Sequence, residues 1–231
     1  MLNKLICPTG NNKSRFHDEK NNFISWRNLV FNGPLALCTA LLRVVFGYRP
    51  QAPWISYEAI EILKNILRRE SQVLEFGSGM STAWYAERSG FVCAVEDFHP
   101  WYAKVSNMLI NKGLANVNYQ FAKDKSEYTT FMSEDVILFD LIVIDGSYRS
   151  DCASAALKKI NPGGIIYLDN SDKDSGPQGG DMRKAEEILL KFAASVNAEV
   201  DYFVDFAPAQ FHVQQGMLVR MPLSTRSILA K

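Results

Sequence analysis

The stretch at residues 72–81 constrains the fold more than any other, because an apolar strand ends there abruptly in glycines. Its sequence is Gln-Val-Leu-Glu-Phe-Gly-Ser-Gly-Met-Ser, and a helical pattern begins at Ser81 or Thr82. A strand, a turn with Gly77 and Gly79, and a helix form the first half of a nucleotide-binding βαβ unit. Glycine has no Cβ, so the chain can turn tightly and a cofactor can approach the peptide plane. The stretch therefore predicts that the protein binds a cofactor, but it does not indicate which reaction the protein catalyses.

Length and charge limit the class of protein. The 231 residues have room for one complete α/β domain and an extension. We predict a helical N-terminal extension at residues 1–55, which begins as a mobile polar arm at residues 1–22, and a domain at residues 56–231. Lysine and arginine total 25, and aspartate and glutamate also total 25. Because the formal net charge is zero, no overall field attracts nucleic acid, and we expect no nucleic-acid partner.

Residues 29–47 are mostly apolar but make a poor membrane span. Four residues interrupt them: Asn32, Gly33, Pro34 and Arg43. The clean run at residues 35–42 is far shorter than the roughly 20 apolar residues that cross a bilayer. We predict a helix at residues 34–46 that is buried or faces a partner, with an interfacial membrane helix as the alternative.

Four cysteines bear on the cellular compartment. They stand 31, 55 and 59 positions apart, which fits neither a zinc knuckle nor a redox pair: Cys7, Cys38, Cys93 and Cys152. We therefore expect reduced thiols in a cytoplasmic protein. The sequence leaves open whether the chain forms a homo-oligomer.

Strand-like and helix-like segments alternate from residue 56 onwards. Strands are predicted at residues 73–76, 91–95, 117–121, 141–144, 164–168, 199–205 and 216–221. Helices are predicted at residues 57–69, 81–89, 100–112, 127–132, 151–160 and 181–194, with a turn at 161–164 and a mobile lid or a disordered loop at 171–180. This alternation predicts an α/β fold with a Rossmann-like, mostly parallel seven-stranded sheet and helices on both faces. Too few residues separate the last two strands for a crossover helix, so the last strand should be antiparallel.

The domain resembles the class I S-adenosylmethionine-dependent methyltransferases over about residues 56–221. Four segments carry the resemblance: Val-Leu-Glu-Phe-Gly-Ser-Gly-Met-Ser-Thr at 73–82, Ala-Val-Glu at 94–96, Asp-Leu-Ile-Val-Ile-Asp-Gly at 140–146, and Pro-Gly-Gly-Ile-Ile-Tyr-Leu-Asp-Asn at 162–170. A dinucleotide-binding fold is the competing interpretation. It is disfavoured because Met80, Ser81 and Thr82 follow Gly79, so the third glycine of G-x-G-x-x-G is absent.

The resemblance implies that S-adenosylmethionine is the cofactor. The residues that it implicates in binding the cofactor are Glu75, Gly77, Ser78, Gly79, Ser81, Thr82, Glu96, Asp124 and Asp145. Glu96 follows Gly77 by 19 residues, near the offset of roughly 20 at which an acid reaches ribose hydroxyls, although such an acid can also be a solvated loop residue. Glu75 would anchor the loop or the ammonium group, and Asp124 would contact the adenine amino group.

A metal site is a further expectation at the carboxyl ends of the strands, which carry Asp145, Asp169 and Asn170. The pattern resembles the metal-dependent catechol and caffeoyl-coenzyme A O-methyltransferases, which implies Mg²⁺ or another divalent cation. The chain departs from that family at residues 146–149, where Gly-Ser-Tyr-Arg replaces an acid–lysine continuation. The alternative is that Asp145 contacts cofactor or substrate and Asp169 caps the following loop.

Three residues are candidates for catalysis: Asp145, His212 and Tyr148. His212 would serve as a general base, and Tyr148 would contact the acceptor. The predicted function is O-methylation of a small-molecule hydroxyl. The alternatives are aminopropyl transfer from the decarboxylated cofactor on the same fold and a non-catalytic module that binds S-adenosylmethionine or a nucleotide.

Overall fold

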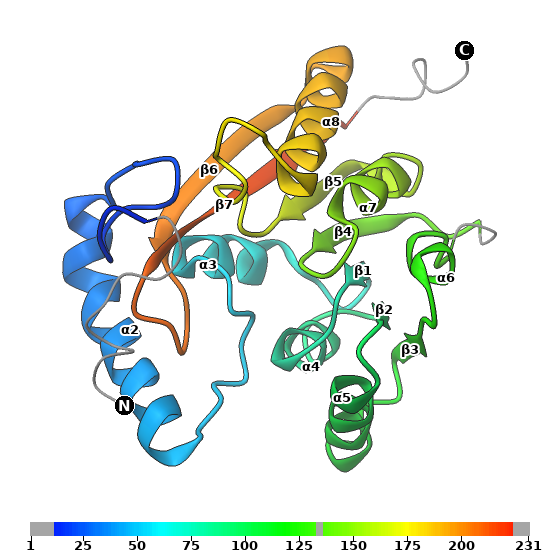
Figure 1. The fold of residues 1–231 in the computed structure, drawn as a ribbon. Coiled ribbons are helices and arrows are strands. Elements are labelled where there is room, and N and C mark those ends of the chain that lie inside the picture. Colours follow the sequence, from blue (N-terminus) through cyan, green and yellow to red (C-terminus); the bar gives the residue numbers. More distant parts are fainter. Residues whose placement is uncertain (1–11, 133–135, 224–231) are drawn as a thin grey trace.

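The computed structural model describes residues 12–132 and 136–223, which form one seven-stranded sheet flanked by helices (Figure 1). The strands are β1 (Gln72–Phe76), β2 (Phe91–Glu96), β3 (Val117–Phe121), β4 (Phe139–Ile144), β5 (Ile160–Leu168), β6 (Glu199–Phe206) and β7 (Val213–Arg220). The helices are α2 (Trp26–Phe46), α3 (Tyr57–Ile66), α4 (Met80–Ala86), α5 (His99–Asn111), α6 (Lys125–Thr129), α7 (Arg149–Ala156) and α8 (Asp181–Val196). The predicted α/β fold is confirmed.

The strand order is β3-β2-β1-β4-β5-β7-β6. Strands β1 to β5 pair in parallel, whereas β7 is antiparallel to both β5 and β6. The order reverses direction at the centre of the sheet, between β1 and β4. In open sheets of this kind, ligands bind beyond the carboxyl ends of the strands at such a switch point. The topology therefore predicts a ligand-binding site at the loops that follow β1 and β4.

Both faces of the sheet are covered, because successive strand residues point to opposite sides. Leu74 belongs to the hydrophobic cluster that includes residues of α7 and α8, such as Ala153 and Leu189. The preceding Val73 belongs to the cluster on the other face, where Leu63 of α3 is packed. The predicted arrangement of helices on both faces is confirmed.

Several predicted boundaries are corrected by the structure. Strand β5 begins at Ile160, so residues 161–164 belong to this strand rather than to a turn, and a register shift between Phe139 and Leu141 accommodates them. Strand β7 begins three residues earlier than predicted. Helices α3, α4, α6 and α7 end earlier than predicted, since the residues that follow them belong to loops or turns.

Helix α2 is longer than the sequence suggests, since it begins at Trp26 and not at Pro34. Ser25 caps it by accepting the backbone N–H of Asn28, and Pro34 lies inside the helix. Proline is favoured in the first turn of a helix, and this preference produced the wrong start. Side-chain contacts hold the earlier turns instead: Asn28 donates to Glu58 Oε2 at 3.1 Å, and Asn32 donates to Asp205 Oδ2 at 2.8 Å.

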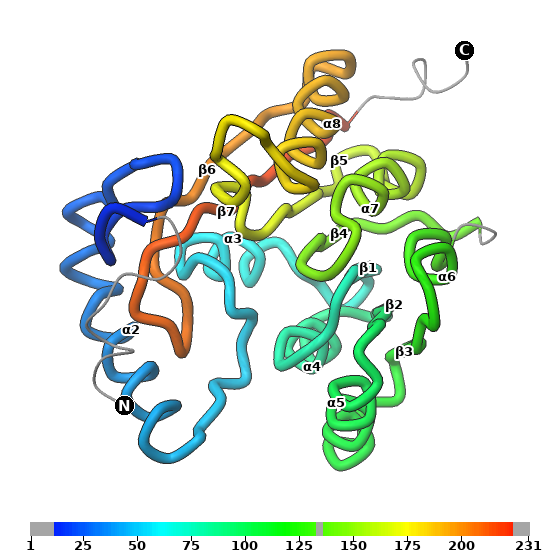
Figure 2. The backbone as a smooth tube through the Cα atoms, viewed as in Figure 1, coloured from blue at the N-terminus to red at the C-terminus, as the bar shows by residue number. Residues whose placement is uncertain are grey.

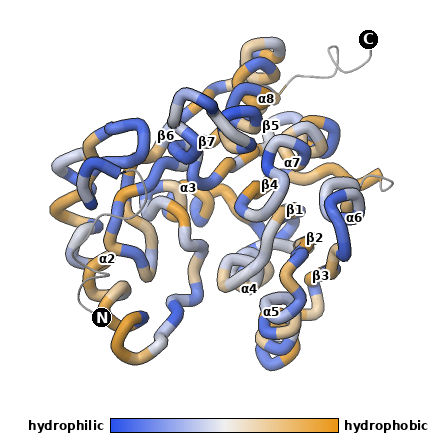
Figure 3. The backbone as a smooth tube through the Cα atoms, viewed as in Figure 1, coloured by the Kyte–Doolittle hydropathy of each residue, from blue (hydrophilic) through white to orange (hydrophobic). Residues whose placement is uncertain are grey.

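The inner face of α2 is small and polar, and its outer face is apolar. Gly33, Ala36 and Ala40 are buried, and α2 contacts β6. The exposed large apolar side chains of α2 are Trp26, Val30, Phe31, Leu35, Leu37, Leu41, Val45 and Phe46. Much of the α2 backbone is accordingly coloured as hydrophobic in Figure 3. With 21 residues, a mean hydropathy of 1.8 and 17% burial, α2 is long and apolar enough by composition to cross a membrane. The apolar face of α2 is thus exposed rather than buried, and contact of that face with a partner or with a membrane stays a prediction.

Residues 12–22, which we call the N-terminal hook, are packed against the last two strands rather than forming a mobile arm (Figure 2). The backbone N–H of Val213 donates to Arg15 O at 2.9 Å, and Asp18 is fully buried. Lys20 Nζ lies 2.6 Å from Glu186 Oε1. The polar residues that suggested mobility are thus satisfied by partners far along the chain. Residues 1–11 of the predicted arm lie outside the described residues.

The segment at residues 171–180 begins as a fixed loop. Ser171 and Asp172 are fully buried, and Asp172 Oδ1 accepts the backbone N–H of Gln215 at 3.1 Å. Lys173 Nζ lies 2.8 Å from Glu19 Oε1 of the N-terminal hook. A fully mobile lid and a disordered loop are therefore both wrong for the first half of this segment, since buried hydrogen bonds hold it.

Candidate active site

The glycine turn after β1 lies directly against the loop after β4. Gly77 has a φ of +115°, a conformation that residues with a Cβ rarely adopt. A Cβ at this position would lie 3.1 Å from the carbonyl carbon of Asp145 and 3.1 Å from the backbone nitrogen of Gly146. The close approach of two backbone segments explains why the motif needs glycine here.

Glu75 anchors the glycine turn through hydrogen bonds. It is 1% exposed, and its two carboxylate oxygens accept hydrogen bonds from Ser81 Oγ at 2.5 Å and from Thr82 Oγ1 at 2.6 Å. Thr82 Oγ1 in turn accepts the backbone N–H of Gly79 at 2.9 Å. The network links three of the predicted cofactor residues to Glu75, which supports its role as an anchor of the loop. Burial raises the pKa of Glu75 to about 8, although both hydroxyl donors oppose the shift.

The pKa of Glu75 predicts how stability depends on pH. Between pH 4.5 and 8 the carboxyl group is ionised in the unfolded chain and protonated in the fold, so the free energy of unfolding should fall as pH rises through that range. Glu75→Gln removes this contribution, and the fall should be smaller in the variant. Urea unfolding at intervals from pH 5 to 8 measures the slope. Glu61→Gln, at an exposed position on α3, should keep the wild-type slope; equal slopes in the wild type and Glu75→Gln would contradict the assignment.

Glu96 ends β2 beside the same turn. Its carboxylate accepts Ser78 Oγ at 2.7 Å and the backbone N–H groups of Asp97 at 3.2 Å and Phe98 at 3.0 Å. Burial raises its pKa, and these hydrogen bonds act in the opposite direction. The carboxylate is therefore fixed in place next to the glycine turn, as a residue that binds a ribose diol would need to be.

Beyond Glu96, aromatic rings form a cluster. The ring centroids of Tyr102 and Tyr119 are 4.6 Å apart, and those of Tyr102 and Phe121 are 5.5 Å apart. Tyr119 Oη lies 2.8 Å from Ser78 Oγ, which connects the cluster to Glu96. Asp124, the predicted adenine contact, caps α6 by accepting the backbone N–H of Glu127 at 2.9 Å. Its contact with adenine stays a prediction.

Half-buried Asp145 and buried Asp169 form a carboxyl pair at the ends of β4 and β5, with their side chains hydrogen-bonded to each other. Burial raises the pKa of both, and the charge of Asp145 raises that of Asp169 further. Arg149 opposes both shifts, since its Nη2 lies 3.2 Å from Asp145 Oδ1. The side chain of Asp145 keeps 33% of its surface exposed, whereas Asp169 is only 3% exposed. We therefore assign the shared proton to Asp169 and the negative charge to Asp145.

This pair does not fit a divalent cation as it stands. Arg149 already supplies positive charge to Asp145 and also donates to the backbone carbonyl of Asp169. A hard cation prefers several oxygen ligands, and Arg149 already occupies one oxygen of each of these two residues. Within residues 12–132 and 136–223, no group of three His, Cys, Asp or Glu side chains is arranged to hold a metal. The predicted site of Asp145, Asp169 and Asn170 stays a prediction.

Tyr148 and Asn170 lie at a second cavity of about 270 Å³, which Arg149 and Lys173 also line. Both residues have positive φ angles, 51° for Tyr148 and 54° for Asn170. The Tyr148 ring packs edge-on against Tyr128, with ring centroids 5.7 Å apart. The structure thus puts these two candidates beside Arg149, on the α7 side of the carboxyl pair.

His212 lies between β6 and β7, and burial lowers its pKa to about 4. It is therefore neutral at neutral pH, and the lowered pKa makes it a weaker base than an ordinary histidine. The nearby Gln214 donates from Nε2 to Trp54 O at 3.1 Å and lies 3.5 Å from Asp169 Oδ1. Gln214 in β7 thus borders the carboxyl pair two residues after His212, and the role of His212 as a base stays a prediction.

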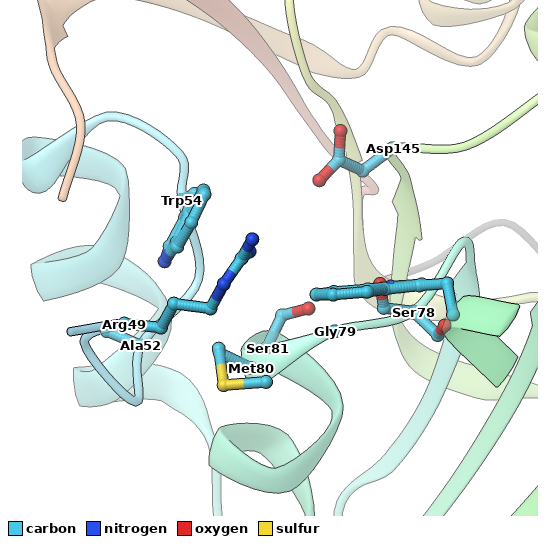
Figure 4. Close-up of a pocket in the computed structure, with 9 residues that line it drawn as sticks. Arg49, Ala52, Trp54, Ser78, Gly79, Met80, Ser81 and Asp145 are labelled. Carbon is cyan, nitrogen blue, oxygen red and sulfur yellow. The ribbon is translucent and has the colours of Figure 1, made fainter. Parts of the chain in front are cut away.

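A small cavity of about 100 Å³ joins the glycine turn to Asp145 (Figure 4). Its floor is formed by four consecutive residues of the turn and α4: Ser78, Gly79, Met80 and Ser81. Arg49, Ala52 and Trp54 cover it from the linker between α2 and α3 (Figure 4). Trp101 of α5 completes the lining and donates from Nε1 to Ser78 O at 2.9 Å. Residues of the predicted extension and of the predicted domain therefore share one cavity.

Solved structures resemble the fold of this chain, although no family model and no curated protein sequence matches it. The O-methyltransferase TomG from Streptomyces achromogenes, in complex with SAM, is 19% identical with a TM-score of 0.59, over 81% of this chain and 89% of that chain. The O-methyltransferase from Bacillus cereus, in complex with SAH, is 17% identical with a TM-score of 0.60, over 81% and 90%. This chain has their fold.

The same fold also occurs in a structure described as an rRNA methylase. That protein, from Streptococcus thermophilus, is 15% identical with a TM-score of 0.53, and the match covers 73% of this chain and 96% of that chain. The predicted resemblance to class I methyltransferases is thus confirmed at the level of the fold. At such low identity the likeness leaves the acceptor open.

Sequence reasoning missed several residues around the cavity. Arg49 and Trp54 lie in a linker whose two prolines suggested only a connection between helices, and Gln214 precedes the predicted start of the last strand. One signal was available: two large aromatic or cationic side chains occur within six residues of irregular chain just before the domain. Large aromatic and cationic side chains in a loop are often functional, because binding and catalytic residues are concentrated on loops that a rigid scaffold positions.

Proposed function

We propose that the protein is an S-adenosylmethionine-dependent methyltransferase that acts on a hydroxyl group of a small molecule. The observation that carries the proposal is the meeting of the glycine turn, Glu96 and Asp145 at the switch point of the sheet. Glu96 hydrogen-bonds the turn through Ser78, and the cavity joins the turn to Asp145. The sulfonium of the bound cofactor supplies an activated methyl group, so the protein mainly has to align donor and acceptor and accept one proton.

The residues around the turn fit this cofactor in their chemistry. Glu96 offers a fixed carboxylate for the two ribose hydroxyls, and the rings of Tyr102, Tyr119 and Phe121 offer an apolar surface nearby. The strained conformation of Gly77 leaves the peptide plane uncovered by a side chain. Asp124 is retained as the proposed partner of the adenine amino group.

We assign the role of general base to Asp145. Its carboxylate is oriented by Arg149 and by the protonated Asp169, and its raised pKa makes it a stronger base than an ordinary aspartate. It lies at the cavity beside the turn where the donor would bind. His212 is the alternative base, and Tyr148 is proposed to contact the acceptor from the second cavity.

A small acceptor suits the covered cavity better than a polynucleotide does. Arg49 and Trp54 lie over the turn, and the formal net charge of zero provides no general attraction for phosphates. We further propose a cytoplasmic location, because Cys38 and Cys152 are free thiols. Cys7 lies outside the described residues. The exposed face of α2 is available to a partner or a second copy of the chain.

The function is tested by cofactor binding and by transfer. Calorimetry should detect binding of S-adenosylhomocysteine, and a lack of binding at millimolar ligand would contradict the proposal.

Asp145→Asn should lower methyl transfer by about 100-fold or more while S-adenosylhomocysteine still binds. Asp151→Asn, on the exposed surface of α7, is the control and should keep full activity. Since Arg149 occupies the carboxyl pair, EDTA should leave transfer unchanged; loss of activity in EDTA would restore the metal hypothesis.

A further inference from the structure

Arg49 is held between two tryptophans above the small cavity. Its guanidinium carbon lies 5.2 Å from the ring centroid of Trp54 and 5.2 Å from that of Trp101. Stacking on two indole rings fixes the plane of the guanidinium while leaving its N–H groups free to donate at the edge. Trp101 is itself fixed by its hydrogen bond to Ser78 O.

Among the described residues, the guanidinium of Arg49 has no acidic partner. In the part of the chain that the structure describes, its contacts are the two indole rings, and neither a carboxylate nor a hydrogen-bond acceptor pairs with it. Arg43 stacks on the same Trp54 ring at 4.7 Å and adds a second positive charge. Arg43 itself donates to the backbone carbonyl of Ala209 at 3.2 Å, whereas Arg49, which lines the cavity, has no such acceptor among the described residues. Partly buried arginines usually pair with an anion or a carbonyl, so an Arg49 guanidinium without an acceptor at a cavity favours an anionic ligand.

The position of the cavity indicates which end of the cofactor it would receive. Ser78 connects two regions. Its side chain hydrogen-bonds Glu96, and Ser78 also lines the cavity together with Gly79, Ser81 and Arg49. If the ribose binds Glu96, the opposite end of the extended cofactor crosses the turn and enters the cavity. About 100 Å³ suits a carboxylate and an ammonium group but not a nucleoside.

We propose that Arg49 binds the carboxylate of the donor's methionine moiety through a two-pronged hydrogen bond. The inference rests on the proposed function and deepens it, because it says which donor the site selects. A guanidinium fork matches the two oxygens of a carboxylate, and leaving it unmatched beside Arg43 is unfavourable. The site therefore selects S-adenosylmethionine over its decarboxylated form, and methyl transfer over aminopropyl transfer.

A carboxylate on the acceptor is the other source of the same chemistry. A carboxylate of the acceptor could also bind Arg49, because Arg49 and Asp145 line the same cavity. The two sources differ in one measurable respect: only the donor's carboxylate makes the binding of S-adenosylhomocysteine alone depend on Arg49. The experiment therefore uses the full chain and these ligands without any acceptor.

The test compares two ligands by calorimetry. S-adenosylhomocysteine carries the amino-acid part, and 5′-methylthioadenosine has the same adenine, ribose and thioether without it. Arg49→Met should weaken S-adenosylhomocysteine by about 30-fold, Arg49→Lys should weaken it less, and neither should change the affinity for 5′-methylthioadenosine by more than about twofold. Arg88→Met is the matched control, because Arg88 also stacks on a tryptophan, at 4.2 Å from the Trp84 ring centroid.

The outcomes separate failure of the inference from failure of the proposed function. If the wild type binds S-adenosylhomocysteine and Arg49→Met binds it equally well, the inference is overturned and the carboxylate belongs to the acceptor. Equal losses for both ligands would also overturn it, because Arg49 would then act by packing Trp54 and Trp101. If the wild type binds neither ligand, the proposed function itself fails. Circular dichroism melting of each variant checks that the fold is retained.

Discussion

Gly77→Ala should lower the free energy of unfolding by about 3 kcal/mol and abolish binding of S-adenosylhomocysteine. The alanine would have to keep a φ of +115°, and its Cβ would lie 3.1 Å from two backbone atoms of residues 145 and 146. Neither atom belongs to a flexible side chain, so β1 and β4 must separate at their carboxyl ends. Urea unfolding measures the loss of stability, and calorimetry measures the loss of binding.

A second glycine provides the matched control for this substitution. Gly113 also has a positive φ, +65°, but a Cβ there would meet nothing within 4 Å. Gly113→Ala should therefore cost only the conformational strain of about 1 kcal/mol and leave ligand binding intact. Equal destabilisation at the two positions would mean that the contact with residues 145 and 146 contributes nothing to the requirement for glycine.

Glu96→Ala should weaken S-adenosylhomocysteine by about 100-fold, because two charge-assisted hydrogen bonds to the ribose would be lost. Glu96→Gln keeps one good acceptor and should show an intermediate loss. Unlike the Arg49 variants, both should weaken 5′-methylthioadenosine as strongly as S-adenosylhomocysteine, since both ligands contain the ribose. Calorimetry with the two ligands measures both affinities.

The neighbouring Asp97 supplies the control for Glu96. It follows Glu96 at the end of β2, and its backbone N–H rather than its side chain contacts the Glu96 carboxylate. Asp97→Asn should therefore change either affinity by less than about threefold. Binding to Glu96→Ala within a factor of two of the wild type would remove Glu96 from the ribose site and leave it as a residue that supports the turn.

The central sheet could be predicted because its signals are local. A strand such as 73–76 is a short apolar run that stops at glycine, and the helix after it begins with hydroxyl residues. Glu75 and Glu96 follow from the same logic, since each stands at a fixed offset from that turn. The roles of Glu75 and Glu96 depend on their position relative to the glycine turn, and the sequence alone gives that position.

The covering of the site could not be predicted, because it depends on contacts between distant segments. Arg49 has no periodic pattern around it, and only the docking of α2 on β6 brings its linker across the glycine turn. The start of α2 was misplaced for a related reason: Asn28 and Asn32 look like interruptions of an apolar helix until Glu58 and Asp205 are known to accept their hydrogen bonds.

The N-terminal hook has a consequence for how the chain acquires its structure during synthesis. Asn12 donates to the carbonyl of Val213, a residue 201 positions later, and Lys20 pairs with Glu186. A chain made from its N-terminus has neither partner until its last strands emerge from the ribosome. The hook must therefore remain undocked during most of translation, and the first described residues become ordered only with the last.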